Sequence, residues 1–419
     1  MPIEQRTIRF NALSNRVSKL NVRYVYFILI ALQYTAISLT ASNGTIYYLL
    51  HGVTKSWIGY LGVISAITIV VFEFPTGIMA DRFGCSLSVS VSFILRGIAA
   101  LLTIFCYGPV MFSIITFISS IGFTCFSGAS EAWAFSKDAS IKKNIAKFFA
   151  DTFIINGIAR IVGGSLGGGL ASLSGDIPFI VSGTTLLVTA ILFITYDYFL
   201  PKEDSHAKNI KQQSSIRYLY SDILNTLKII VADKTLWRIT VSGAFFIVFS
   251  VIPFIFWQPF FYESTDSMSA LGGIWAVFIS MNILGSLASK SGWIKNKDPL
   301  DVFRMSIFLS GMALLISALA KSCLVISLIS FFLYHFFIGV IGPIRGNLIN
   351  QRIGNERRAS ILSFISFSES FGSILSYSIF GYLCNFYELN LVLALSVIPL
   401  LFSLLVAIKI PKEQDEYPA

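Results

Sequence analysis

The sequence predicts an all-α integral membrane protein with twelve transmembrane helices arranged as two related six-helix bundles. Three observations lead to this fold class: an apolar composition, twelve long hydrophobic stretches, and a short motif that recurs in both halves. Of the 419 residues, 55% are hydrophobic and 13% are charged, and the mean hydropathy is +0.75. Soluble domains carry about 25% charged residues, so the expected surroundings of this chain are a lipid bilayer.

Each hydrophobic stretch is long enough to cross a bilayer, which takes ~20 mostly apolar residues. Several stretches are longer than this, which indicates tilted or kinked helices rather than additional crossings. The predicted spans are 24–50, 57–80, 87–107, 109–135, 147–173, 178–199, 235–262, 270–289, 300–320, 322–349, 360–384 and 389–409.

The lysines and arginines predict which ends of the spans face the cytoplasm, because short cytoplasmic loops retain positive residues. If the N-terminus is cytoplasmic, the predicted outside loops contain only Lys55 and Lys321. Both termini are therefore expected to be cytoplasmic. The short loops and modest length of the chain indicate a bacterial cytoplasmic membrane. The same bias explains the net charge of +9 through contact with lipid headgroups, so no nucleic-acid partner is expected.

One long polar stretch divides the chain. Residues 200–234 are predicted to be a cytoplasmic linker with an amphipathic helix around 215–232, which suits a helix lying on headgroups. The linker would join an N-terminal bundle, 1–199, to a C-terminal bundle, 235–419. The loops contain no nucleophile–base set or phosphate loop, and the five cysteines show no metal-ligand spacing. We therefore predict no enzyme activity, metal or cofactor.

A short motif follows the second span of each half. Residues 77–84 read GIMADRFG and residues 285–292 read GSLASKSG, so both have the pattern G-x-x-A-polar-basic-x-G. Duplicated halves around a central cavity are typical of transporters. The stretch 77–89 resembles the motif G-x-L-A-D-R-x-G-R-R/K-x-x-L of the major facilitator superfamily. It departs from that motif at Cys85 and Ser86, where the family usually has basic residues.

The resemblance implies a transporter that works by alternating access, with gating residues Gly77, Asp81, Arg82 and Gly84. In the family the aspartate holds the end of the eleventh helix when the cytoplasmic side is closed, and Asp81 is expected to do the same. A helix N-terminus carries about half a positive charge, which would favour this contact. The alternative is that Asp81 and Arg82 are solvated turn residues. Pro75 is expected to bend the helix just before the motif.

Ionisable residues inside the spans cost about 2.5–3.5 kcal/mol each on insertion scales and are candidates for function. Glu73, Glu131 and Glu369 are candidates for proton coupling, because a carboxylate that loses its water in one conformation can carry a proton. A fixed ion-pair network of Glu73, Arg96 and Glu131 is the alternative. For Glu369 and His335 the alternative is a satisfied polar or packing contact. The six ionisable residues are Glu73, Arg96, Glu131, Arg160, His335 and Glu369.

Arg160 must meet a carboxylate, carbonyl groups or an anionic ligand, because arginine does not readily lose its proton. The glycines that follow it allow the fifth span to pack closely and to bend. They resemble the G-P-x-x-G-G part of the fifth-helix motif of drug:proton antiporters in the superfamily, with glycine in place of proline at 164. These packing residues are Gly163, Gly164, Gly167 and Gly168.

The resemblance also places the first, fourth, seventh and tenth helices around a central cavity. It makes the second helix face the eleventh, with Glu73 and Glu369, and the fifth face the eighth, with Arg160 and Asn282. The expected lining would admit a small amphipathic molecule. Its polar and aromatic members are Gln33, Tyr34, Asn43, Thr124, Phe254, Gln258, Tyr334 and His335.

Three functions fit these features. A proton-coupled exporter of a small amphipathic compound, such as a drug or metabolite, agrees with the apolar cavity and the intramembrane carboxylates. An uptake permease for a small organic solute or anion would use Arg160 as an anion anchor. A membrane sensor or enzyme is the third, although the loops are too short to hold a catalytic domain. For transport, the expected unit is a monomer that exchanges a small molecule and protons across the bilayer.

Overall fold

The structure is a computed structural model that describes residues 21–138, 140–200, 226–353 and 358–411. Helices make up nearly all of this part of the chain, and no strand occurs in it. The first twenty residues and most of the predicted linker lie outside the described residues. Of the amphipathic helix expected at 215–232, residues 226–232 are described and are helical.

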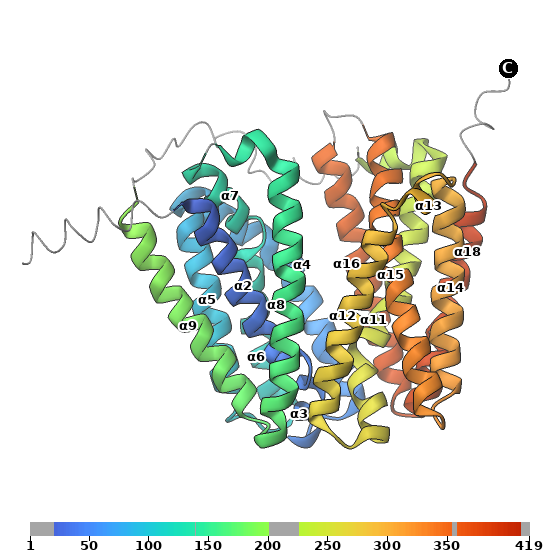
Figure 1. The fold of residues 1–419 in the computed structure, drawn as a ribbon, viewed down its shortest axis with the longest axis horizontal. Helices are drawn as coiled ribbons and strands as arrows, with labels where there is room; N and C mark the ends of the chain where they lie inside the picture. Colours follow the sequence, from blue (N-terminus) through green and yellow to red (C-terminus); the bar gives the residue numbers. More distant parts are fainter. Residues whose placement is uncertain (1–20, 139, 201–225, 354–357, 412–419) are drawn as a thin grey trace, which may run out of the picture. The chain divides into compact units, whose positions relative to one another are not determined.

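The helices of the N-terminal half run in the predicted order, and within each unit defined below the long helices lie side by side (Figure 1). They are α2 (Val22–Ala41), α3 (Gly44–Leu50), α4 (Lys55–Phe83), α5 (Cys85–Thr103), α6 (Gly108–Phe126), α7 (Ala129–Lys137), the 3₁₀ helix η1 (Ile141–Asn144), α8 (Ile145–Leu173) and α9 (Ile177–Tyr198).

The C-terminal half repeats this pattern of long helices joined by short connections. Its helices are α11 (Lys234–Thr265), α12 (Met268–Ala288), α13 (Gly292–Lys295), α14 (Pro299–Leu319), α15 (Leu324–Arg352), α16 (Arg358–Leu383), α17 (Leu389–Leu395) and α18 (Val397–Ile408).

Each of the twelve predicted spans is occupied by helix, which confirms the all-α membrane fold. Ten of these stretches are long and apolar enough to cross a membrane within the described residues. The other two are α8 and α16, with 29 and 26 residues. Both are long enough for a span, but Lys147, Asp151 and Arg160 of α8 and the serines and Glu369 of α16 lower their hydropathy.

The contacts between helices divide the chain into two compact units. The first unit contains residues 1–44 and 67–208, and the second contains residues 45–66 and 209–419. The sequence places the division in the linker, so the segment 45–66 differs from that expectation. This segment covers α3 and the first part of α4, and its contacts are with helices of the second unit.

Three predicted spans are broken into two helices. The first span breaks at Ser42 and Asn43, where Asn43 Nδ2 donates to the carbonyl oxygens of Leu39 at 3.0 Å and Gly167 at 3.1 Å. The fourth breaks at Gly128, whose φ of 74° favours glycine. The twelfth breaks at Ser396. Discontinuous helices expose backbone polar groups, which in transporters often lie near the transport path.

The glycines of α8 allow this helix to pack directly on α2. A Cβ atom at Gly163 would overlap the Thr35 carbonyl oxygen, and one at Gly167 would overlap the Leu39 carbonyl oxygen. Because neither glycine has a side chain, the two backbones come into contact. The fifth span is therefore closely packed on the first.

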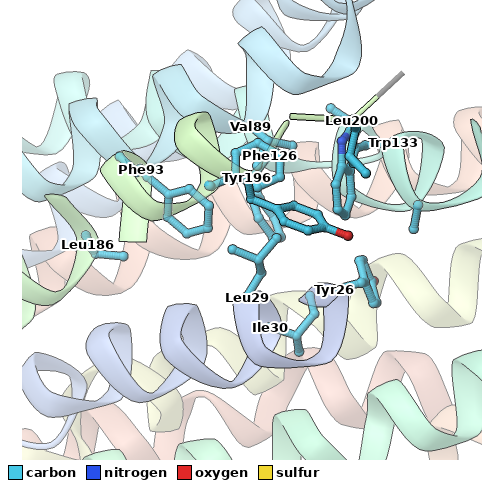
Figure 2. Close-up of a cluster of buried hydrophobic side chains, with 14 of the residues drawn as sticks. Tyr26, Leu29, Ile30, Val89, Phe93, Phe126, Trp133, Leu186, Tyr196 and Leu200 are labelled. Carbon is cyan, nitrogen blue, oxygen red and sulfur yellow. The ribbon is translucent and has the colours of Figure 1, made fainter. Parts of the chain in front are cut away.

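Aromatic side chains fill the core of the first unit near one end of its helices. Tyr26 packs on Phe148 with ring centroids 4.7 Å apart, and Trp133 packs on Phe193 at 4.9 Å. Figure 2 shows Phe93, Trp133 and Tyr196 among side chains that converge from several helices. Trp133 Nε1 donates to Asp197 Oδ1 at 2.8 Å, so its polar atom is satisfied.

Candidate functional site

Arg96 lies on α5 inside the first unit. Its Nη1 atom is fully buried and has no hydrogen-bond partner among the described residues, and none of their carboxylates is within ion-pair distance. The guanidinium carbon lies 6.0 Å from the centre of the Phe123 ring. Gly122 leaves room for the stem of the arginine, because a Cβ there would lie 2.6 Å from Arg96 Cγ. The bundle thus holds this cation without a counterion from the described chain.

Tyr34 connects Arg96 with the second intramembrane arginine of this unit. The tyrosine, on α2, interacts electrostatically with Arg96 and with Arg160 of α8. All three side chains are partly buried. The structure therefore brings Tyr34 and Arg160 together with Arg96. All three were substrate or ion-pair candidates from the sequence. We call Arg96, Tyr34 and Arg160 the arginine cluster.

Glu131 is satisfied by hydroxyl groups rather than by arginine. It lies in the first turn of α7, where the helix dipole favours a negative charge. Tyr26 donates to its Oε1 at 3.4 Å and Ser130 to its Oε2 at 2.8 Å. No ion pair joins Glu73, Arg96 and Glu131 among the described residues. The structure thus contradicts the alternative of a fixed ion-pair network.

The gating motif lies at the end of α4. Asp81 and Arg82 are exposed, as is Glu73 two turns earlier. That Glu73 faces the eleventh helix stays a prediction. Gly77 has open space around its Cα, whereas Gly84 has a φ of 97° and begins the turn to α5. Pro75 lies inside the continuous helix α4. The positive φ explains why the motif ends in glycine.

Gln33 and Asn43 are the buried polar residues of α2 and of the break that follows it. Gln33 is 2% exposed and Asn43 is 1% exposed. The Asn43 amide bridges α2 and α8, as described above. It therefore holds the helix break in place. Its expected role in lining a cavity stays a prediction.

In the second unit, His335 is part of an aromatic cluster between α11, α12 and α15. Its ring stacks on Phe278 with centroids 4.2 Å apart and an interplanar angle of 17°. Tyr334 and Phe331 also contact it. The amide of Asn282 donates to the His335 carbonyl oxygen at 3.5 Å. His335 is only 6% exposed, which agrees with the packing alternative from the sequence.

Gln258 binds the backbone of the segment 45–66. Its Oε1 accepts from the Thr45 amide nitrogen at 2.9 Å, at the start of α3. A second polar contact of this segment is made by Lys55, whose Nζ lies 2.9 Å from Glu263 Oε1; Lys321 Nζ lies 2.7 Å from Glu263 Oε2. The two lysines expected in outside loops thus share one carboxylate.

Glu369 pairs with Arg345, an arginine that was not among the ionisable candidates named from the sequence. Arg345 Nη1, near the end of α15, lies 2.5 Å from Glu369 Oε1 on α16. The two residues are 24 positions apart on different helices. The usual signal for an ion pair, a spacing of three or four residues on one helix, therefore could not have revealed this contact.

Comparisons with known proteins agree with this architecture. The family model described as Major Facilitator Superfamily matches residues 25–376. The Bacillus subtilis protein described as "Uncharacterized MFS-type transporter YxaM" is 24% identical over 85% of this chain and 88% of its own length.

Two of the similar solved structures are a nucleoside transporter, NupG, and a D-xylose-proton symporter. NupG has a TM-score of 0.72 and 16% identity, over 93% of this chain and all of that chain. The symporter has a TM-score of 0.72 and 13% identity, over 95% and 98% of the two chains. At these identities the likeness extends to the fold alone.

Proposed function

Because the chain belongs to the major facilitator superfamily, we propose that it is a proton-coupled secondary transporter for a small organic anion. It would work by alternating access, in which the two halves expose a central site to one side of the membrane and then to the other. We choose an anion because the buried Nη1 of Arg96 has no hydrogen-bond partner among the described residues.

A buried arginine inside a membrane span, such as Arg96, is stabilised by a negatively charged partner. Arginine stays protonated in proteins, and a charged side chain at the centre of a span costs about 2.5–3.5 kcal/mol on insertion scales. In the first unit the intramembrane carboxylate Glu131 is bound by two hydroxyl groups. A bound anion would therefore offset a charge that the described chain leaves uncompensated.

The arginine cluster also favours a carboxylate over other anions of similar size. A guanidinium group offers parallel N–H donors that match the two oxygens of a carboxylate. Arg160 adds a second positive charge, and Tyr34 can donate a hydroxyl hydrogen bond. Phe123 lies beside Arg96, so the rest of the ligand would contact apolar surface. These groups suit an organic acid with an apolar portion.

Export of an amphipathic compound in exchange for protons is the second candidate. The close contact of Gly163 and Gly167 with α2 favours it, because the resemblance links a glycine-rich fifth helix to antiporters. The direction can be tested in inverted vesicles with an acidic lumen. Substrate accumulation in the lumen would support export, whereas uptake only into right-side-out vesicles would support a permease.

The anion proposal is tested by comparing acids with uncharged analogues of the same shape. Purified protein in lipid nanodiscs would be titrated calorimetrically with paired probes, beginning with benzoate and benzamide. We expect binding of the carboxylate and not of the amide. In Arg96→Gln, loss of a buried charge pair, worth about 2–5 kcal/mol, should weaken binding at least ~30-fold.

The control variant is Arg23→Gln, which removes the same charge from the same unit. Arg23 is paired with Asp151 and is not part of the arginine cluster, so its loss should leave the affinity within about twofold, the range of minor surface effects. Equal affinity for acids and amides would refute the proposal. An unchanged affinity in Arg96→Gln would refute the assigned site.

A further inference from the structure

A groove runs between α11 and α16 in the second unit, where the two helices pack side by side (Figure 1). It has a volume of about 340 Å³ and is lined by one face of each helix, within 237–248 of α11 and 364–375 of α16. The groove lies at the surface of the described chain, because Phe367 and Phe371 on its wall are 54% and 57% exposed. Its volume is at the small end of the range for ligand pockets, about 300–1,000 Å³.

The walls of the groove offer a ligand few polar groups. Thr240 Oγ1 donates to the Leu236 carbonyl oxygen at 2.9 Å. Ser368 Oγ donates to the Ile365 carbonyl oxygen at 2.7 Å. Both hydroxyl groups are therefore used within their own helices. The other lining residue with a polar side-chain atom is Trp237, which lies near the start of α11. An occupant of the groove must accordingly be apolar along its length and can be polar only at the end next to Trp237.

The groove is about as long as one leaflet of a bilayer is thick. Each wall extends over about 11 residues, which is about 16 Å at 1.5 Å per residue. Half of the hydrocarbon core is ~15 Å. Trp237 is 39% exposed at one end, and amphipathic tryptophan rings are typical of the boundary between hydrocarbon and headgroups. The groove thus has the length and the polarity for one acyl chain of a lipid whose headgroup lies beside Trp237.

Three exposed basic residues are found at this same end. Two of them are the first residues of α11 and α16, and the third follows Leu227, a lining residue from the described end of the linker. None of the three forms an ion pair with a carboxylate of the described chain. Their charge is therefore available to a negatively charged headgroup. We call these residues the basic end of the groove: Lys228, Lys234 and Arg358.

The acidic residue next to the basic end, Asp233, is engaged elsewhere. Its Oδ1 accepts from the amide nitrogens of Thr235 at 2.9 Å and Leu236 at 3.0 Å, which caps α11. The same atom lies 4.0 Å from Nη1 of Arg352. One carboxylate thus faces a helix start and a fourth cation, so the described residues at this end of the groove keep a net positive charge.

We propose that the groove is a binding site for an anionic phospholipid such as phosphatidylglycerol. One acyl chain lies between α11 and α16, and the basic end contacts the phosphate. Lipid tails surround the whole bundle and are as apolar as leucine, so the tail alone gives little preference for one lipid over another. The preference comes from charge, because each lysine or arginine at a membrane surface strengthens binding of anionic lipid about fivefold. This lipid site is independent of anion binding at the arginine cluster.

Trp237 makes the occupant of the groove measurable. The full-length protein would be placed in phosphatidylcholine nanodiscs with increasing fractions of phosphatidylglycerol that carries brominated acyl chains. A parallel series would use brominated phosphatidylcholine. Bromine quenches nearby tryptophan fluorescence, and the part of the signal that is missing in Trp237→Phe reports on the groove. We expect this part to be half quenched at a fraction of phosphatidylglycerol at least about fivefold below that of phosphatidylcholine.

The role of charge is tested by Lys234→Gln, which removes one positive charge from the basic end. It should reduce the preference for phosphatidylglycerol about fivefold. The matched control is Lys290→Gln. Lys290 is exposed after α12 in the same unit, and α12 does not line the groove, so its loss should leave the preference unchanged. Both side chains are exposed, so the fold should survive either change.

The role of shape is tested by Ala244→Leu, which places a larger side chain in the groove. This variant should weaken the quenching of Trp237 by both brominated lipids, because the acyl chain loses its space. The control is Ala276→Leu. Ala276 is half-buried, as Ala244 is, but lies on α12 outside the groove, so quenching of Trp237 should stay as in the wild type.

Three results would overturn the lipid site. Equal quenching of Trp237 by the two brominated lipids would show that the groove holds whatever lipid surrounds the protein. Protection of Trp237 from both lipids would show that protein covers the groove. A loss of preference as large in Lys290→Gln as in Lys234→Gln would assign the effect to the overall charge of the protein. None of these results depends on whether the protein binds benzoate.

Discussion

Replacing Gly59 with alanine should loosen the contact between the segment 45–66 and α16. A Cβ atom at Gly59 would lie 2.6 Å from Gly381 Cα and 2.8 Å from the Tyr377 carbonyl oxygen. Both are backbone atoms, which cannot move aside as a flexible side chain can. The two helices would therefore have to separate to accommodate the methyl group.

The size of the effect follows from this geometry. Non-bonded carbon atoms are most stable about 3.5–4.0 Å apart, so the backbones must separate by about 1 Å to relieve the clash with Gly381. Overpacking of this kind typically costs about 1–3 kcal/mol. If this free-energy cost applies only to the state in which the segment 45–66 touches α16, the equilibrium constant for separating the two rises about 5- to 150-fold.

The opening can be measured with a cysteine introduced at Ser56, which is 6% exposed beside this contact. Its reaction with a water-soluble maleimide should accelerate in Gly59→Ala by the factor given above. The native thiol of Cys384 follows the end of α16, next to this contact, so Cys384 would be replaced by serine. The exposed Cys323 would be replaced.

The control for this experiment is Gly273→Ala, in the same unit. Nothing lies within 4 Å of a Cβ atom at Gly273, so labelling of the cysteine at 56 should be unchanged. If Gly59→Ala and Gly273→Ala give the same labelling rate as the parent, the close crossing of α4 and α16 does not control this contact, and the reasoning is wrong.

Two further predictions use the same contacts and glycines. Gly167→Ala should lower the thermal unfolding midpoint, because its methyl group would overlap the Leu39 carbonyl oxygen at a cost of about 1–3 kcal/mol. The control Gly169→Ala, whose methyl group meets open space, should leave the midpoint unchanged. Equal midpoints for the two variants would contradict the packing argument. Glu263→Gln removes two partly exposed ion pairs, each worth about 0–1 kcal/mol. Glu263→Gln should therefore lower the free energy of unfolding slightly in denaturant titrations, and this loss should disappear at 1 M salt, because salt screens exposed charges. A loss of stability that remains at 1 M salt would indicate a packing effect instead.

Local features of the chain account for what could be predicted. Hydropathy and span length depend only on neighbouring residues and on the thickness of the bilayer, so all twelve spans were found as helix. The breaks within three spans were missed, although Gly128 and Asn43 carry recognisable signals: glycine permits a positive φ, and asparagine can satisfy exposed backbone groups.

The candidate site depended more on contacts between distant residues. The sequence indicated that Arg96, Arg160 and Glu369 are costly in a membrane and therefore important, but not which partners they have. Their expected partners were chosen from family geometry and charge. In the structure, Arg96 lies beside Tyr34 and Phe123 instead of a carboxylate.

The sequence by itself determined the membrane environment, the helical fold, the duplicated halves and the close packing of the glycine-rich α8, because each follows from local composition and spacing. That α8 packs on α2 came from the tertiary structure. Only the tertiary structure decided that α11, α15 and α16 bring Gly243, Arg345 and Glu369 together. The physical reason is that an ion pair inside a membrane is selected by the relative rotation and depth of separate helices. The rotation and depth of a helix arise from packing between helices and produce no periodic pattern in the sequence.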